Sequence, residues 1–211
     1  MSATPLRKEP MTTRREFVKA AAAGAVALAL AGLPSGRSEA EAKYPHWGKA
    51  VLVRDEAATD GPSINRKVVQ EMLEESVKVL TNGGGWPSLF SSYKTGEKVG
   101  IKVNCQWPRV PTQPKVVAAI VQALTGMGIP RDKIIIWDSD GDALMYSEMF
   151  GISMEFAGVR VMATDKLNDP LDPGKTVDLQ GNPAPLSRLL TEADHLINVP
   201  VLKNHFEAGV T

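Results

Sequence analysis

Residues 133–142 read KIIIWDSDGD, and this stretch decides the fold class. Its first half, 133–137, is almost wholly apolar, which is typical of a strand that is covered on both faces. Acidic residues follow at once, at Asp138, Asp140 and Asp142. The stretch therefore predicts a buried strand of an α/β sheet, with polar groups gathered where the strand ends.

Apolar runs and helical segments alternate along the rest of the chain. Further strands are predicted at 50–54, 98–104, 159–163 and 195–202. Helices are predicted after Asn65, which can cap one, and at 115–127, 143–150 and 186–193. Proline and glycine predict loops at 82–85 and 168–185.

This alternation implies parallel strand pairing through right-handed crossovers. We therefore predict one three-layer, Rossmann-like α/β domain over residues 43–211. Its mostly parallel sheet should have about five strands, and we expect it to be incomplete at the C-terminal end.

The composition narrows the class of protein. The 211 residues carry 24 basic and 24 acidic side chains, so no excess of positive charge points to a nucleic-acid partner. Cys105 is the single cysteine, which excludes an internal disulfide and leaves no CxxC pair for zinc or an iron–sulfur cluster. A metal would have to bind through histidine, aspartate, glutamate or that one thiolate.

Residues 1–42 have the three parts of a cleavable export signal: a charged start, an apolar run at 20–33, and small residues at Ala40 and Ala42. The charged part resembles a twin-arginine motif, made of Arg14, Arg15, Phe17 and Lys19. The apolar run is shorter than the roughly 20 residues that span a bilayer. We expect a twin-arginine signal peptide, cleaved after Ala42 or Ala40.

Such a signal predicts a periplasmic or otherwise extracytoplasmic protein. The twin-arginine translocation machinery is then its expected protein partner, and no stable membrane span is expected after cleavage. A membrane anchor is the alternative interpretation of the same segment.

All five predicted strands end in polar or ionisable residues. In chain order these are Arg54, Asp55, Asn104, Cys105, Asp138, Asp140, Asp142, Thr164, Asp165, Lys203 and His205. Ligands of open α/β sheets bind outside the carboxyl ends of the strands, so these groups should line one crevice. Loops at strand ends are polar in any case, and each residue taken singly has that ordinary explanation.

Three of these residues are the catalytic candidates. Lys203 can clamp an anionic substrate or, if burial lowers its pKa, act as an amine nucleophile; otherwise it is a strand-end lysine in solvent. His205 can be a general base or a metal ligand, or a plain helix-start histidine. Asp138 can act in acid–base chemistry or bind a divalent ion. The expected ligand or cofactor contacts are Asn104, Asn204 and Gly209.

The acidic run at 138–142 resembles the start of a calcium loop. However, Ala143 stands where that loop needs glycine and Met149 where it needs glutamate, so a calcium loop is rejected. The thiol of Cys105 is expected to be packed and inert, because no basic neighbour is identifiable. His195 reads as incidental at the start of a strand.

Four stretches resemble a known family: VGIKVNC at 99–105, Pro-Thr-x-Pro at 111–114, IIIWD at 134–138, and SRLLTEADHLINVPVLKNHFEAGVT at 187–211. Together they resemble the domain-of-unknown-function family 362, and in particular its twin-arginine-exported branch. Some members of that family carry ferredoxin-type cysteine clusters, which this chain lacks. Since the family pattern continues past Thr211, we expect the chain to be truncated at its C-terminus.

A more distant similarity is to the nickel-pincer lactate racemases, which also place a histidine before an Ala-Gly turn. His205 matches that histidine, and the lysine that follows in those enzymes would lie beyond Thr211. The similarity bears on fold and site, since a shared fold does not fix function.

The sequence thus predicts an exported α/β protein, an enzyme or enzyme-like, that acts on a small anionic molecule at the strand exits. Acid–base or redox chemistry would suit the groups there. A non-catalytic protein that binds a cofactor, metal or anion is the alternative, and a non-functional fragment is the third hypothesis. The cofactor stays unassigned: a metal fits the candidate residues, whereas an iron–sulfur cluster is not expected.

Overall fold

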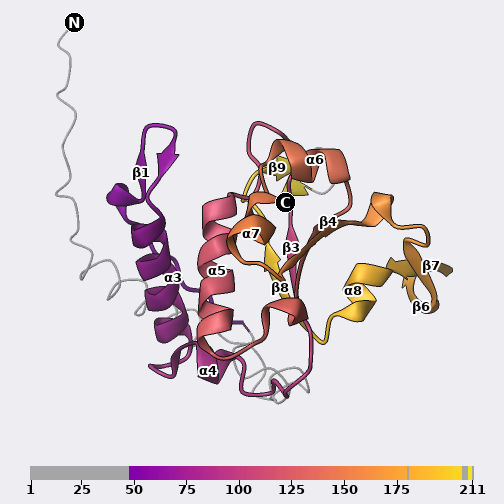
Figure 1. Ribbon diagram of the computed structural model, residues 1–211, viewed down its shortest axis with the longest axis horizontal. Coiled ribbons are helices and arrows are strands. Elements are labelled where there is room, and N and C mark those ends of the chain that lie inside the picture. The colour runs from indigo at the N-terminus through magenta and orange to yellow at the C-terminus, as the bar shows by residue number, and fades with distance from the viewer. Residues whose placement is uncertain (1–47, 180, 206–208, 211) are drawn as a thin grey trace, which may run out of the picture.

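A four-stranded parallel sheet lies at the centre of the computed structural model, which describes residues 48–179, 181–205 and 209–210 (Figure 1). Its strands are β3 (Val99–Val103), β4 (Ile134–Asp138), β5 (Arg160–Ala163) and β8 (His195–Val199). They are ordered β5-β4-β3-β8, and every neighbouring pair is parallel. The predicted Rossmann-like α/β class is confirmed.

One face of the sheet carries the main core. Helix α5 (Pro114–Gly126) lies against it, and α3 (Arg66–Leu80) packs on α5 (Figure 1). The buried side chains of α5 recur at helical spacing and come from Val117, Ile120, Val121 and Leu124. Asn65 caps α3 as predicted, since its side chain accepts a hydrogen bond from the backbone N–H of Val68.

A thinner layer covers the other face. It consists of α8 (Arg188–Glu192), whose Leu189 is buried against Ile135 and Trp137 of β4. The Trp137 ring lies over Gly100 of β3, where an added Cβ would come within 2.6 Å of the ring. Glycine is therefore required at this point of β3, because any side chain would collide with the indole.

The prediction of a first strand at 50–54 is wrong. These residues form no strand, and Leu52 is 67% exposed. They lead into a 3-10 turn, η1 (Glu56–Ala58), and a small hairpin of β1 (Thr59–Asp60) and β2 (Ser63–Ile64). A short apolar run becomes a strand only where a sheet edge pairs with it, which local sequence does not specify. Over the described residues, the parallel sheet therefore has four strands instead of about five.

The predicted loop at 168–185 is also wrong. It forms an exposed antiparallel hairpin of β6 (Leu171–Leu179) and β7 (Asn182–Ser187), which projects beside α8 (Figure 1). The prolines of this segment led to the prediction of a loop, because proline is disfavoured inside a sheet. It is tolerated on exposed edge strands such as these. The pairing of β6 with β7 is also irregular, with a register shift between Asp172 and Thr176.

The remaining segments differ from prediction in their bounds. The helix predicted at 143–150 forms as α6 (Gly141–Tyr146), followed by α7 (Gly151–Glu155), and the glycine-rich loop runs into α4 (Gly85–Leu89). Short turns η2 (Arg131–Lys133) and η3 (Thr164–Lys166) flank β4 and β5. A last hairpin pairs β9 (Asn204–His205) with β10 (Gly209–Val210). No helix in the described ranges is long and apolar enough to cross a bilayer.

Strand β8 lies at an edge of the sheet, where a buried strand was predicted. It ends at Val199, before Pro200, and none of its residues is fully buried. The predicted signal, with Arg14, Arg15, Phe17 and Lys19, lies outside the described residues.

His195 fixes the start of β8 and is not incidental. Its Nε2 lies 2.7 Å from Oε2 of Glu97, and its ring lies 5.6 Å from that of Tyr93. The hydrogen bond with His195 lowers the pKa of the Glu97 carboxyl. This contact thereby links the entry to β3 with the entry to β8, whose register places Val99 opposite His195.

We expect this pairing to make stability depend on pH. Because the pKa of Glu97 is lower in the folded chain than its usual 4.5, the contribution is present above that value and is lost as pH falls through the folded value. The difference in unfolding free energy between wild type and Glu97→Gln should therefore shrink as pH falls below about 4.5. Urea unfolding at each pH measures it. Glu71→Gln, an exposed change on α3, is the control, and a difference independent of pH would refute the expectation.

Candidate functional site

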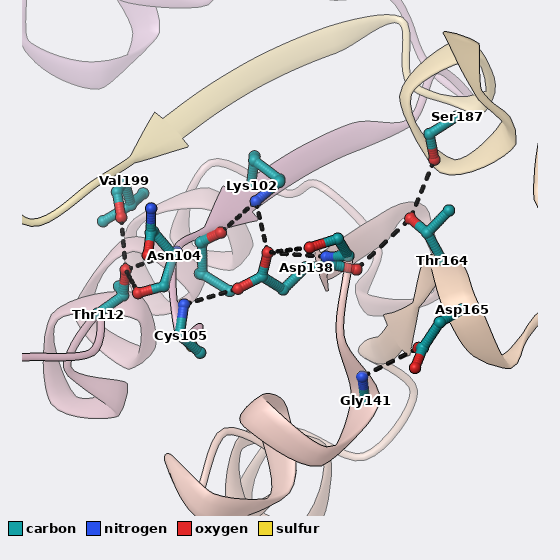
Figure 2. A network of polar contacts seen from close by, with 12 residues as sticks. Lys102, Asn104, Cys105, Thr112, Asp138, Gly141, Thr164, Asp165, Ser187 and Val199 are labelled. Carbon is teal, nitrogen blue, oxygen red and sulfur yellow. Dashed lines mark hydrogen bonds and ion pairs between the residues drawn. The ribbon is translucent and has the colours of Figure 1, made fainter. Parts of the chain in front are cut away.

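The four parallel strands end at one edge of the sheet, and Figure 2 shows polar groups there that follow β3, β4 and β5, together with the carbonyl group of Val199 at the end of β8. Asp138, the last residue of β4, lies at the centre and is only 3% exposed. Its Oδ1 accepts hydrogen bonds from the Lys102 ammonium at 2.7 Å and from the Ser139 backbone N–H at 2.7 Å. Its Oδ2 accepts one from the backbone N–H of Cys105 at 2.6 Å.

Both carboxylate oxygens of Asp138 are thus occupied by donors. A carboxylate in this state holds its neighbours in place, since most of its acceptor sites are already used. Asp138 therefore fits the role of an anchor for Lys102 better than that of a free general base.

Lys102 was missed by the sequence analysis. It lies within β3, its side chain is 32% exposed, and its ammonium also donates to the carbonyl oxygen of Val103 at 2.5 Å. The one signal was a charged residue inside an otherwise apolar strand, which demands a partner. That partner, Asp138, belongs to the neighbouring strand, so pairing was needed to identify it.

Lys203 and Asn104 are brought together as the strand-exit hypothesis requires. The Lys203 ammonium donates to Oδ1 of Asn104 at 2.9 Å, although 99 positions separate the two residues in sequence. Asn104 follows β3 and Lys203 follows β8, which are neighbours in the sheet. Over the described part of the chain, no carboxylate lies within ion-pair distance of Lys203.

Thr112 holds this contact in place and was not predicted. Its hydroxyl accepts from the backbone N–H of Asn104 at 2.9 Å and donates to the carbonyl oxygen of Val199 at 2.7 Å. Its own N–H donates to the carbonyl oxygen of Asn104 at 2.8 Å. Since Thr112 is 2% exposed, this bridge between the β3 and β8 exits is shielded from water.

At the β5 exit the polar groups serve mainly to hold the loops. The Thr164 hydroxyl lies 3.1 Å from that of Ser187, and Asp165 accepts from the Gly141 N–H at 3.0 Å (Figure 2). Asp140 caps α6. Asp142 is exposed and pairs with Lys166, whose pKa is raised by that carboxylate and by Asp165.

The structure bears on two further predictions, one for the thiol of Cys105 and one for Arg54 and Asp55. Cys105 is buried, and loss of solvation raises the pKa of its thiol, which fits a packed and inert side chain. Arg54 and Asp55 do not follow a strand of the parallel sheet: they precede η1, which lies with the β1–β2 hairpin near the N-terminal end of α3 (Figure 1). Among the described residues, no three His, Cys, Asp or Glu side chains are grouped to hold a metal.

The residues after Lys203 are described through their backbone. Asn204 pairs with Val210 and His205 with Gly209, so the chain turns back directly after the lysine. The roles proposed for the side chains of Asn204 and His205 stay predictions, as does the metal-ligand role of His205.

A comparison with protein families matches residues 99–211 to the family described as Domain of unknown function (DUF362). The chain belongs to this family. The DUF362 match begins at the first residue of β3, so it includes the whole parallel sheet and every residue of the strand-exit site, whereas α3 precedes it. The comparisons with curated proteins and with solved structures found no match.

Proposed function

We propose that this DUF362 protein binds a small anionic molecule at the exits of β3, β4 and β8 and acts on it as an enzyme. The observation that carries the proposal is the environment of Lys203. Its ammonium is held by the neutral amide of Asn104 rather than by a carboxylate. On the paired strands β3 and β4, Lys102 and Asp138 neutralise each other. Of these three charged groups, Lys203 is therefore the one whose described partner is neutral, and it lies where open α/β sheets bind ligands.

The proposed chemistry follows from the hydrogen-bond donors and proton-transferring groups that are still available at the site. The Lys203 ammonium has three donors, of which Asn104 takes one, so it can bind an anionic oxygen without breaking its present contact. His205, two residues on, would supply the proton-transferring group that the engaged carboxylate of Asp138 does not offer. The similarity of the His205 segment to the nickel-pincer lactate racemases supports an organic acid as substrate.

A non-catalytic anion-binding protein is the second candidate. The observation in its favour is that both oxygens of Asp138 are already hydrogen-bonded, which leaves no free carboxylate base at the centre of the site. The two candidates differ in what His205→Ala does. A binding protein should bind and do no chemistry in either form. An enzyme should exchange a carbon-bound proton of its acid in D2O and lose that exchange in the variant.

Removal of the Lys203 charge tests anion binding itself. Because a hydrogen bond to a charged group is worth about 1.5–3 kcal/mol, Lys203→Gln should weaken the binding of acetate and inorganic phosphate by about tenfold or more. Isothermal titration calorimetry measures the affinity. Lys166→Gln is the matched control, since it removes a strand-exit lysine that two carboxylates already neutralise. Equal losses for both variants would mean that only the overall charge matters and would refute the site.

We also propose that the protein is exported by the twin-arginine route and acts outside the cytoplasm. The support is the order of charged, apolar and small residues in 1–42, with the adjacent Arg14 and Arg15. Replacing both arginines with lysine should leave the full-length precursor in the cytoplasm. Cell fractionation measures this, and processing of the variant at the wild-type level would refute that route.

A further inference from the structure

The loop between β3 and α5, residues 105–111, is tied to the strand-exit site at both ends. At its start, the backbone N–H of Cys105 donates to Asp138. At its base, Asn104 and Thr112 exchange two hydrogen bonds, one through the Thr112 hydroxyl and one through its N–H. The loop rises at the same end of the molecule as α6 and β9 (Figure 1). It is therefore a fixed part of the rim around that site.

The tip of the loop is a formed turn with exposed apolar groups. The backbone N–H of Val110 donates to the carbonyl oxygen of Trp107 at 3.1 Å, and Pro108 occupies the second position, where its fixed φ suits a turn. Trp107 is 58% exposed and Arg109 is also exposed.

Single exposed apolar residues are common on protein surfaces. This tryptophan differs because the turn that carries it is held by two buried groups, Thr112 and Cys105, that also build the site. The ring is thus carried three residues after Asn104, which holds Lys203, and an arginine lies two residues further along the same turn. An indole and a guanidinium bind different parts of one ligand: a flat apolar group and a carboxylate.

We propose that the loop 105–111 is the specificity-determining rim of the site and selects organic carboxylates that carry a flat apolar group. The carboxylate would bind Lys203 and Arg109, and the apolar group would pack on Trp107. This inference rests on the anion-binding function proposed above and adds the class of ligand to it. Inorganic anions would contact only Lys203 and Arg109, and the indole of Trp107 would add nothing to their affinity.

The test compares benzoate, acetate and inorganic phosphate by calorimetry on the full-length protein. Wild type should bind benzoate about three- to tenfold more tightly than acetate, the range expected for a contact with an aromatic ring. Trp107→Ala should bind the two equally. Tyr146→Ala, which removes an exposed aromatic from neighbouring α6, should keep the preference. Arg109→Gln should weaken both carboxylates to a similar extent.

The outcomes separate the two proposals. If acetate and phosphate bind through Lys203 but Trp107→Ala keeps the preference for benzoate, the rim proposal is overturned and the anion site stands. Tighter binding of phosphate than of benzoate by wild type would overturn the rim proposal too. Lack of binding by all three anions would overturn both. Because Trp107 is exposed, its replacement should leave the thermal midpoint unchanged, which a thermal melt checks alongside.

Discussion

Asp138→Asn should lower the free energy of unfolding by about 3 to 5 kcal/mol, the range found when one partner of a buried ion pair is removed. The side chain is 4% exposed, so water does not replace the lost contacts. Lys102 contributes less to the loss than a buried partner would, because its own side chain is 32% exposed. The larger share comes from the backbone donors of Cys105 and Ser139.

Asparagine has the shape of aspartate, but it cannot replace Asp138 because its NH2 group is a hydrogen-bond donor where an acceptor is needed. Donors approach both oxygens of Asp138: Lys102 and Ser139 at Oδ1, and Cys105 at Oδ2. An amide has one oxygen and one NH2 group, and in either orientation the NH2 faces another donor. A buried donor without an acceptor costs about 1–3 kcal/mol, in addition to the loss of the charge.

Asp165→Asn is the matched control for this variant. Asp165 is also a strand-exit carboxylate, but its side chain is 43% exposed and one backbone N–H, that of Gly141, donates to it. An amide can keep that bond through its oxygen, so the loss should stay within about 1 kcal/mol. Urea unfolding of both variants measures the difference, provided that the urea dependence of the free energy is unchanged. A loss at Asp138 no greater than at Asp165 would mean that the network does not stabilise the fold.

The sequence was sufficient where a signal is local. The apolar run at 133–137 predicted β4, and the helical spacing around Leu124 predicted α5, because both elements are specified by the periodicity of buried side chains. Asn65 was identified as a helix cap because this signal is local too: the side chain of a cap bonds a backbone N–H within the next three residues. The expectation that strand exits would gather polar groups led to the contact between Asn104 and Lys203.

The sequence was insufficient where a partner distant in the chain decides the structure. The contacts of Lys102 with Asp138 and of Thr112 with Val199 depend on which strands are neighbours, so even the charge of Lys102 in an apolar strand does not show which residue is its partner. The segment 50–54 has the composition of a strand, but no neighbouring edge pairs with it. In each case the register and order of the sheet carry information that local propensity lacks.

Strand β8 illustrates the same limit and leads to the second prediction. Its segment at 195–202 was predicted as a buried strand, like that of β4, although it includes His195 and Asn198. In the sheet, Ile135 of β4 and Leu196 of β8 lie in one row on the same face, on either side of Gly100. Ile135 is 0% exposed because β4 is central, whereas Leu196 is 52% exposed because β8 is at an edge.

Ile135→Ala should therefore lower the free energy of unfolding by about 3 kcal/mol, through lost burial and the cavity left against Trp137 and Leu189. Leu196→Ala removes as many carbon atoms from the same row and should cost less than about 1 kcal/mol, since half of that side chain already contacts water. Urea unfolding of the two variants under one set of conditions gives the ratio of the losses. Similar losses would show that the side chain of Leu196 is covered in solution, contrary to the order β5-β4-β3-β8. A large loss at Ile135 with a small one at Leu196 would place β8 at the edge of the sheet in solution. The burial of each side chain would then follow from the place of its strand in the sheet, because isoleucine and leucine are apolar side chains of the same size.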